Sequence, residues 1–133
     1  MNLKQYNDPV LHEKFRSQYD RTENILVGPE ITEACVATMV SMKKGFETVT
    51  HAHKSEEQIF IVLEGTGLLT LEEENNEIKK GHSVYIPRNA NHKILATSEE
   101  LIYIYISVWP KGKQKELKSK VYEEKRILNI KYE

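Results

Sequence analysis

The feature that most constrains the fold is a series of short, β-branched segments separated by glycine, proline and asparagine. Strand-like runs occupy residues 34–42, 57–63, 68–71, 83–86 and 101–108. The run at 57–63 is too short and too rich in β-branched residues for a helix. A spacing of roughly ten residues between such runs is typical of an all-β sandwich or barrel. The run at 101–108 is apolar on both faces, which predicts a strand buried on both sides.

Turn residues between these runs predict where the strands end. Residues 65–67, Gly-Thr-Gly, separate the second run from the third, and Pro87 ends the fourth run. The polar segment 72–77 is predicted to be a hairpin tip, where Asn75 and Asn76 tolerate the positive φ angles that tight turns need. The chain therefore contains closely connected antiparallel strands.

Strand alternation groups the remaining apolar residues by face. Tyr103, Tyr105 and Trp109 share one face of the strongest run, and the isoleucines and Val108 share the other. One face lines the interior and the other packs outward, but alternation alone does not say which. Cys35, the single cysteine, is predicted to be a buried small hydrophobe.

Length, charge and cysteine content exclude several classes of protein. The chain has 133 residues, a formal net charge of −1 and one cysteine, so we expect one domain without an internal disulfide or a multi-cysteine zinc site. The balanced charge gives no reason to expect a nucleic-acid partner or an anionic membrane surface. No apolar run reaches the roughly 18 residues of a membrane helix, and the start lacks a signal-peptide pattern. We therefore expect a soluble, cytoplasmic protein.

The two ends of the chain differ from its centre. We expect one domain over residues 1–133, with a barrel core at about 25–110 and terminal arms at 1–24 and 111–133. Asp8-Pro9 could cap a short helix. Residues 113–126 could form a helix or a solvated arm, and 127–132 an edge strand. The lysines between 111 and 120 alternate with glutamate further along and lack interleaved aromatic residues, which indicates a solvated tail.

Two histidines in the centre of the chain have the spacing of metal ligands. His51 and His53 follow a strand-like stretch at 47–50, and residues two apart on a strand project to the same face. His12 and His82 have no partner at such spacing. A His-x-His pair alone is a weak signal, so its surroundings decide its meaning.

Those surroundings resemble the two motifs of the cupin superfamily. The family patterns are G-x5-H-x-H-x3,4-E-x6-G and G-x5-P-x-G-x2-H-x3-N. The first matches Gly45, His51, His53, Gln58 and Gly65, and the second matches Gly81, Pro87, Asn89 and His92. The resemblance implies a single double-stranded β-helix, or jelly-roll barrel, with short terminal extensions.

Three positions depart from the family patterns. Gln58 replaces the glutamate, and Glu57 is a rival that could face the same way only through a bulge, because strand alternation puts it on the opposite face. Asn89 replaces a glycine, and asparagine tolerates the left-handed region well. Ala96 replaces the final asparagine and touches no ligand.

The resemblance implies one divalent metal ion held by His51, His53, Gln58 and His92. The candidate ions are zinc, iron, manganese, nickel and copper. Imidazole donors suit zinc, iron, nickel and copper, and three histidines with one weak oxygen donor leave positions open. Four neutral ligands leave the charge of the ion in place, which favours a small anionic or enolic oxygen ligand.

The resemblance also implies the function classes to be weighed. A metal-dependent oxidoreductase or isomerase, dioxygenase-like in the first case, is the favoured interpretation. The alternative is a non-catalytic small-molecule-binding cupin with a vestigial or structural metal site. Small barrels of this family commonly pair, so we expect a homodimer.

Overall fold

The structure, a computed structural model, describes residues 20–112, and within them the chain forms eight strands and no helix. Each of the five predicted runs overlaps a strand, so the all-β prediction is confirmed. None of the described residues belongs to a helix that could cross a membrane. The strands are β1 (Arg21–Val27), β2 (Cys35–Lys43), β3 (Glu57–Glu64), β4 (Thr66–Leu71), β5 (Glu74–Lys79), β6 (Ser83–Ile86), β7 (His92–Ala96) and β8 (Glu100–Val108).

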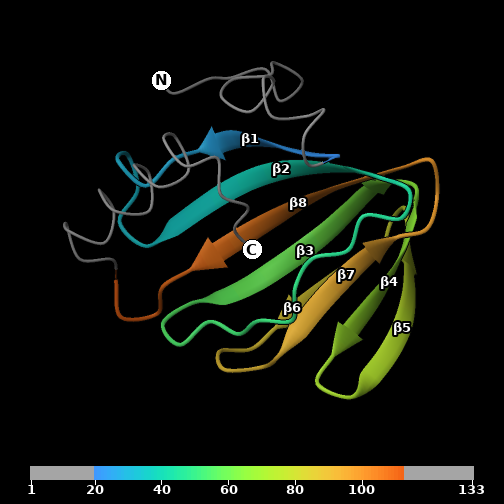
Figure 1. Cartoon of the computed structure of the whole chain (residues 1–133). Helices are drawn as coiled ribbons and strands as arrows, with labels where there is room; N and C mark the ends of the chain where they lie inside the picture. The colour runs from blue at the N-terminus through green and yellow to red at the C-terminus, as the bar shows by residue number, and fades with distance from the viewer. Residues whose placement is uncertain (1–19, 113–133) are drawn as a thin grey trace.

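Two antiparallel sheets enclose the interior (Figure 1). The larger sheet has the order β1-β2-β8-β3-β6, and the smaller has the order β5-β4-β7. The strand that comes last, β8, lies between β2 and β3, so segments far apart in the sequence are hydrogen-bonded neighbours. This crossing connectivity is that of a jelly roll rather than of a simple meander.

The central strand β8 turns its aromatic face inward. Leu101, Tyr103 and Tyr105 are buried, whereas the intervening isoleucines are half-buried. This settles the choice that the sequence left open: the tyrosine face lines the interior, and the isoleucine face packs outward.

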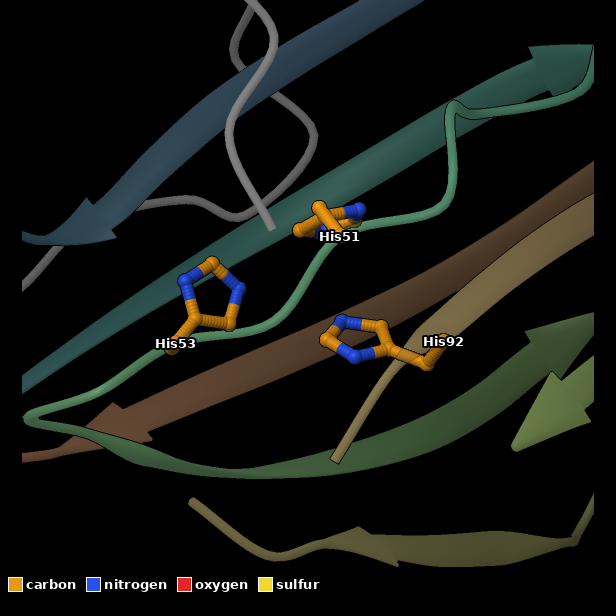
Figure 2. A group of neighbouring side chains, drawn as sticks. All are labelled: His51, His53 and His92. Atoms are coloured by element: carbon orange, nitrogen blue, oxygen red, sulfur yellow. The ribbon is translucent and has the colours of Figure 1, made fainter. Parts of the chain in front are cut away.

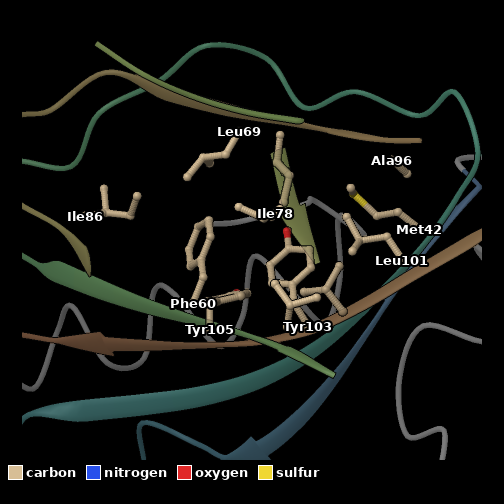
Figure 3. Close-up of a cluster of buried hydrophobic side chains, with 12 residues drawn as sticks. Met42, Phe60, Leu69, Ile78, Ile86, Ala96, Leu101, Tyr103 and Tyr105 are labelled. Atoms are coloured by element: carbon tan, nitrogen blue, oxygen red, sulfur yellow. The ribbon is translucent and has the colours of Figure 1, made fainter. Parts of the chain in front are cut away.

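A cluster of apolar side chains fills the space between the two sheets (Figure 3). Full burial of a Val, Leu, Ile, Phe or Met side chain stabilises a fold by about 1.5–3 kcal/mol through removal from water. The cluster consists of Val40, Met42, Phe60, Val62, Leu69, Ile78, Ile86, Ile94, Ala96, Leu101, Tyr103 and Tyr105. Strand alternation places these residues on the inner faces of the two sheets. The core that they form therefore supports the other side chains that project into the interior.

The β4–β5 hairpin differs from the prediction. Its turn is at Glu72 and Glu73, and the positive φ falls on Glu72 at 55°, whereas Asn75 and Asn76 lie inside β5. The reason is register. Ile78 pairs with Gly67 and is 3% exposed, and a shift by one residue would turn this buried side chain outward.

The break between β3 and β4 is shorter than the predicted segment 65–67, because Gly67 is not part of it. Only Gly65, with φ of 80°, interrupts the chain, and Gly67 is part of β4. A Cβ atom at Gly67 would lie 2.8 Å from Leu101 Cδ2 and 2.9 Å from the Leu95 carbonyl oxygen. This glycine therefore permits close packing rather than a turn.

Strand β1 was not among the predicted runs, because its first residues are polar. It pairs with β2 along its length, with a register shift between Ile25 and Val27. Arg21 and Glu23 are buried and lie opposite Met42 and Val40, two inward-facing residues of β2. A charged pair therefore faces the interior at this edge.

Two further predictions concern the second strand and the chain ends. Cys35 is half-buried, not buried, because alternation in β2 turns Val36 inward and Cys35 outward. The predicted helix after Asp8-Pro9, the segment 113–126, the edge strand 127–132 and His12 lie outside the described residues.

Candidate metal centre

The segment between β2 and β3 brings distant histidines together by pairing with β7 (Figure 1). Glu47 bridges to Leu95 and His51 bridges to His92, although the predicted strand at 47–50 is reduced to these isolated bridges. The His51 amide donates to the His92 carbonyl at 3.1 Å, and the His92 amide donates back at 2.9 Å. The backbone itself therefore sets the two residues side by side.

Three histidines converge at this place (Figure 2). One ring nitrogen each of His51, His53 and His92 lies within 4.8 Å of the other two. The ring centroids are 4.3 Å apart for His51 and His92, 5.0 Å for His51 and His53, and 5.4 Å for His53 and His92. A single ion at about 2.0–2.1 Å from each nitrogen needs the nitrogens within about 4.2 Å of one another, so small side-chain movements would let this group hold one ion.

Each imidazole is oriented through its Nδ1 atom. His51 Nδ1 lies 2.7 Å from the Val49 carbonyl oxygen, and His92 Nδ1 lies 3.0 Å from that of Ala90. His53 Nδ1 lies 3.3 Å from a carboxylate oxygen of Glu56. An acceptor at Nδ1 favours the tautomer with the proton on that atom, which leaves the Nε2 lone pair for a metal.

His92 is the most buried of the three and is held neutral. It is 1% exposed, and this burial lowers its pKa to about 4; the hydrogen bond to Ala90 opposes the decrease and the charge of His51 adds to it. At neutral pH its Nε2 atom is therefore an uncharged lone-pair donor. Among residues 20–112, this atom is buried and has no hydrogen-bond partner.

Gln58 and Glu57 lie on opposite faces of β3, as alternation predicted, and Gln58 is the one that faces inward. Its side chain is fully buried, and its Nε2 atom donates to Ser107 Oγ at 2.9 Å. Its Oε1 atom is buried and accepts no hydrogen bond within the described range. Gln58 as the fourth ligand stays a prediction that this orientation favours.

Glu57, the rival to Gln58, lies on the other face of β3. The pairing of β3 with β6 and β8 is regular through this region, and the only register shift with β8 falls between Val62 and Glu64. The bulge that Glu57 would need is therefore absent from the described strand. Glu57 is half-buried on the side away from Gln58.

The donor chemistry of the cluster fits a cation. His92 Nε2 and Gln58 Oε1 are both lone-pair donors that are buried without a hydrogen-bond partner in the described part of the chain. Buried polar atoms are normally paired, and a missing partner calls for an explanation such as an ion or water. Nitrogen and amide oxygen donors suit a divalent metal ion.

The motif departure at Asn89 is explained by backbone geometry. Asn89 adopts φ of 67°, the left-handed conformation that a glycine at this position would take. Its amide donates to the His53 carbonyl at 2.7 Å, which ties the loop before β7 to the ligand segment. The substitution therefore preserves the loop.

The structure adds two residues that the sequence did not single out, and it separates one histidine from the cluster. Glu56 follows His53 by three residues, a spacing that could have pointed to it, but Ser107 reaches Gln58 only through the β3–β8 register. His82 is exposed and its Nδ1 atom accepts from the Lys79 amide at 3.1 Å, a turn contact.

The fold and the cluster together define the class of protein, a jelly-roll barrel with a three-histidine candidate metal centre. The sequence pattern of the Cupin domain family matches residues 38–109, more than half of the chain. The protein belongs to this family. The predicted cupin double-stranded β-helix is confirmed.

A further relative matches part of the chain. Over 50 residues the chain is 48% identical to an uncharacterized protein of Methanocaldococcus jannaschii, a match that covers 38% of this chain and 40% of that protein. The chain thus spans less than half the length of that relative.

Solved structures share the fold at low sequence identity. KdgF from Halomonas sp. has a TM-score of 0.65 at 20% identity, covering 73% of this chain and 83% of that one. A predicted oxalate decarboxylase from Thermotoga maritima has 0.64 at 20%, covering 67% and 80%. An RmlC-like cupin from Shewanella frigidimarina has 0.62 at 19%, covering 74% and 80%.

Proposed function

We propose that the protein binds one divalent metal ion through His51, His53 and His92, with Gln58 as the fourth donor. The observation that carries the proposal is the shared orientation of the three imidazoles. Each presents Nδ1 to an acceptor, so that Nε2 is left as the donor atom. The ion is zinc, iron, manganese, nickel or copper, because imidazole donors suit zinc, iron, nickel and copper, and the amide carbonyl oxygen of Gln58 is a donor type that suits manganese.

The donor set selects the ligand class. None of the four donors carries a formal negative charge, so the full charge of the ion acts on whatever occupies the open positions. A bound divalent ion supplies Lewis-acid polarisation of substrate oxygens. The ligand is therefore a small molecule with an anionic or enolic oxygen. Phe60, with its ring centroid 6.1 Å from that of His92, provides an apolar wall.

We assign the site to a metal-dependent enzyme, an oxidoreductase of dioxygenase type or an isomerase. One solved relative is described as a predicted oxalate decarboxylase, and oxalate is a small oxygen-bearing anion. The second candidate is a non-catalytic binding protein. It is favoured by the position of Glu56, whose carboxylate contacts His53 and is thereby occupied.

Metal analysis tests the proposal directly. Protein purified without added metal should contain about one divalent ion per chain. His92→Ala and His53→Ala should lower metal affinity more than about 100-fold, because loss of a ligand costs more than loss of its supporting residue. His82→Ala is the matched control and should bind as the wild type does. A metal-free wild type whose melting temperature is unchanged by Zn²⁺, Fe²⁺, Mn²⁺ or Ni²⁺ would overturn the proposal.

Oxygen consumption separates the enzyme from the binder. The iron form, mixed with enolic and flavonol-like compounds, should consume oxygen if the protein is a dioxygenase. Tight binding of the same compounds without turnover, together with failure to isomerise sugar-like enols, would favour the binding protein. The metal identified in the first experiment directs this choice, because iron or copper points to oxygen chemistry.

We also propose that the protein forms a homodimer through the outer face of the larger sheet. Ile59 and Ile61 are each 37% exposed, and Tyr85 is 54% exposed. The strand register places Ile59 beside both Tyr85 and Ile106. A contiguous apolar patch of this kind marks an interaction surface.

Light scattering tests the dimer. The wild type should have twice the chain mass of 15.5 kDa at micromolar concentration. Ile61→Lys should be monomeric, whereas Leu68→Lys, an equally exposed site on the smaller sheet, should remain dimeric. A monomeric wild type would contradict the proposal.

A further inference from the structure

The proposed metal site lacks the negative charge that the glutamate of the family pattern would supply to it. The family pattern places a glutamate where this chain has Gln58, so the coordinating position contributes no negative charge. Gln58 is fully buried and its amide is bonded to Ser107. A divalent ion among neutral donors in a partly desolvated site is costly unless a negative charge lies nearby.

Glu56 places such a charge beside one of the ligands. Its Oε1 atom lies 3.3 Å from His53 Nδ1, and the two side chains are 18% and 19% exposed. The pair is therefore shielded from bulk water over most of its surface. The other two histidines present Nδ1 to the neutral carbonyls of Val49 and Ala90 instead.

The orientation of His53 separates Glu56 from the coordinating positions. Glu56 contacts the Nδ1 side of the ring, and Figure 2 shows the opposite side of the His53 ring turned toward His51 and His92. The carboxylate therefore acts on the ion through the imidazole. A carboxylate at Nδ1 increases the basicity of Nε2 and fixes the ring orientation.

We propose that Glu56 is the positioning and charge-compensating residue of the metal centre, replacing through His53 the carboxylate that Gln58 no longer supplies. This inference rests on the proposed metal-binding function. It also explains how the site keeps its affinity for a cation while its open side stays free of negative charge. Anionic ligands are therefore still attracted to that side.

Metal affinity of matched variants tests the inference. Competition titration with Zn²⁺ and a chromophoric chelator should show Glu56→Gln binding about 10–100-fold more weakly than the wild type, the usual effect of removing a supporting carboxylate. Glu56→Asp should recover part of the loss. Glu57 follows Glu56 in the sequence but lies on the face of β3 opposite to Gln58. Glu57→Gln should therefore bind Zn²⁺ within about twofold of the wild type.

A charge-exchange variant distinguishes compensation from simple structural support. When Gln58→Glu is also present, Glu56→Gln should lower Zn²⁺ affinity much less, because the substitution at position 58 already supplies a carboxylate at the proposed ligand position. The d–d spectrum of the Co²⁺ form should shift in Glu56→Gln and not in Glu57→Gln, since only Glu56 contacts a proposed ligand, His53. Thermal melting of the metal-free variants checks that each is folded. If Glu56→Gln is unfolded, Glu56→Asp takes its place as the test variant.

The outcomes separate this inference from the function on which it rests. If the wild type binds Zn²⁺ and Glu56→Gln binds it equally well, Glu56 is only a surface partner of His53 and the inference is wrong. Equal losses in the presence and absence of Gln58→Glu would also overturn charge compensation. If the wild type itself binds no metal, the proposed function fails and this inference fails with it.

Discussion

Two polar clusters lie inside the barrel, and they differ in how their charges and lone pairs are used. At the β1 edge, Tyr105 donates to Glu23 at 2.8 Å, and Arg21 lies 3.6 Å from the other oxygen of Glu23. In the histidine cluster, by contrast, the Nε2 atom of His92 is buried without a hydrogen-bond partner in residues 20–112.

This difference is the one expected between a structural cluster and the proposed metal-binding cluster. Burial, and then the charge of Glu23, raises the pKa of Tyr105 well above its usual value, so the phenol stays protonated and remains a donor. The β1 cluster thus joins opposite charges and hydrogen bonds among its own members. The histidine cluster instead brings one ring nitrogen each of His51, His53 and His92 within 4.8 Å of the other two, an arrangement that an added cation would stabilise.

The largest expected effect comes from breaking the β1 cluster. Glu23→Gln removes the buried carboxylate that lies 3.6 Å from Arg21 and accepts the Tyr105 hydrogen bond, and loss of one member of a buried ion pair costs about 3–5 kcal/mol. Urea unfolding should show this decrease, while Zn²⁺ affinity of the folded protein stays unchanged. A decrease in metal affinity without a decrease in stability would reverse the roles assigned to the two clusters.

The histidine cluster should instead reveal itself through pH. His92 has a folded-state pKa of about 4, below its ordinary value of 6.5, so the folded state disfavours the protonated ring. Its contribution to stability is complete above pH 6.5 and is lost as the pH falls toward 4, by about 3 kcal/mol. Urea unfolding of metal-free protein at several pH values should show this loss relative to His92→Asn. Parallel pH profiles for the two proteins would contradict it.

The two inward tyrosines sharpen the comparison within the core. Tyr105→Phe removes a hydrogen bond to a charged group and should destabilise the protein by about 2 kcal/mol. Tyr103 is fully buried, yet its hydroxyl has no partner among the described residues, so Tyr103→Phe should be neutral or slightly stabilising. Thermal melting of both variants measures the difference. Equal destabilisation would show that the Tyr103 hydroxyl is bonded after all.

The smallest expected effect concerns the ligand preference of the metal centre. Gln58→Glu adds a negative charge at the donor position and should weaken binding of a simple carboxylate such as acetate about tenfold in the Zn²⁺ form, a cost of about 1.4 kcal/mol. Calorimetric titration of acetate measures it, and Glu57→Gln is the control. Unchanged acetate affinity would remove the argument for anionic ligands.

The pair His51 and His53 could be predicted from a local signal, whereas His92 came from the family motif. Spacing placed His51 and His53 on one face, and the motif brought in His92, which the structure joins to His51 by a backbone bridge. Alternation likewise turned Gln58 inward and Glu57 outward. Short-range periodicity and backbone conformation, as at Asn89, are properties that neighbouring residues determine.

The features that the sequence missed depend on contacts between distant strands. The polar start of β1 gives no strand pattern, and Arg21 and Glu23 are buried only because β1 pairs with β2. The hairpin register depends on Ile78 packing opposite Gly67, so the asparagine pair was a misleading turn signal. Ser107 meets Gln58 through strand pairing that no local pattern encodes.

The reciprocal backbone hydrogen bonds between His51 and His92 have a consequence for how this site can change over evolutionary time. Main-chain atoms hold these two positions in place, so the identity of the side chains is free to vary without loss of the bridge. A lineage that exchanges one histidine would therefore lose the proposed metal-binding capacity before it loses its fold. The backbone at these two positions can therefore carry different sets of donor side chains, changed one substitution at a time.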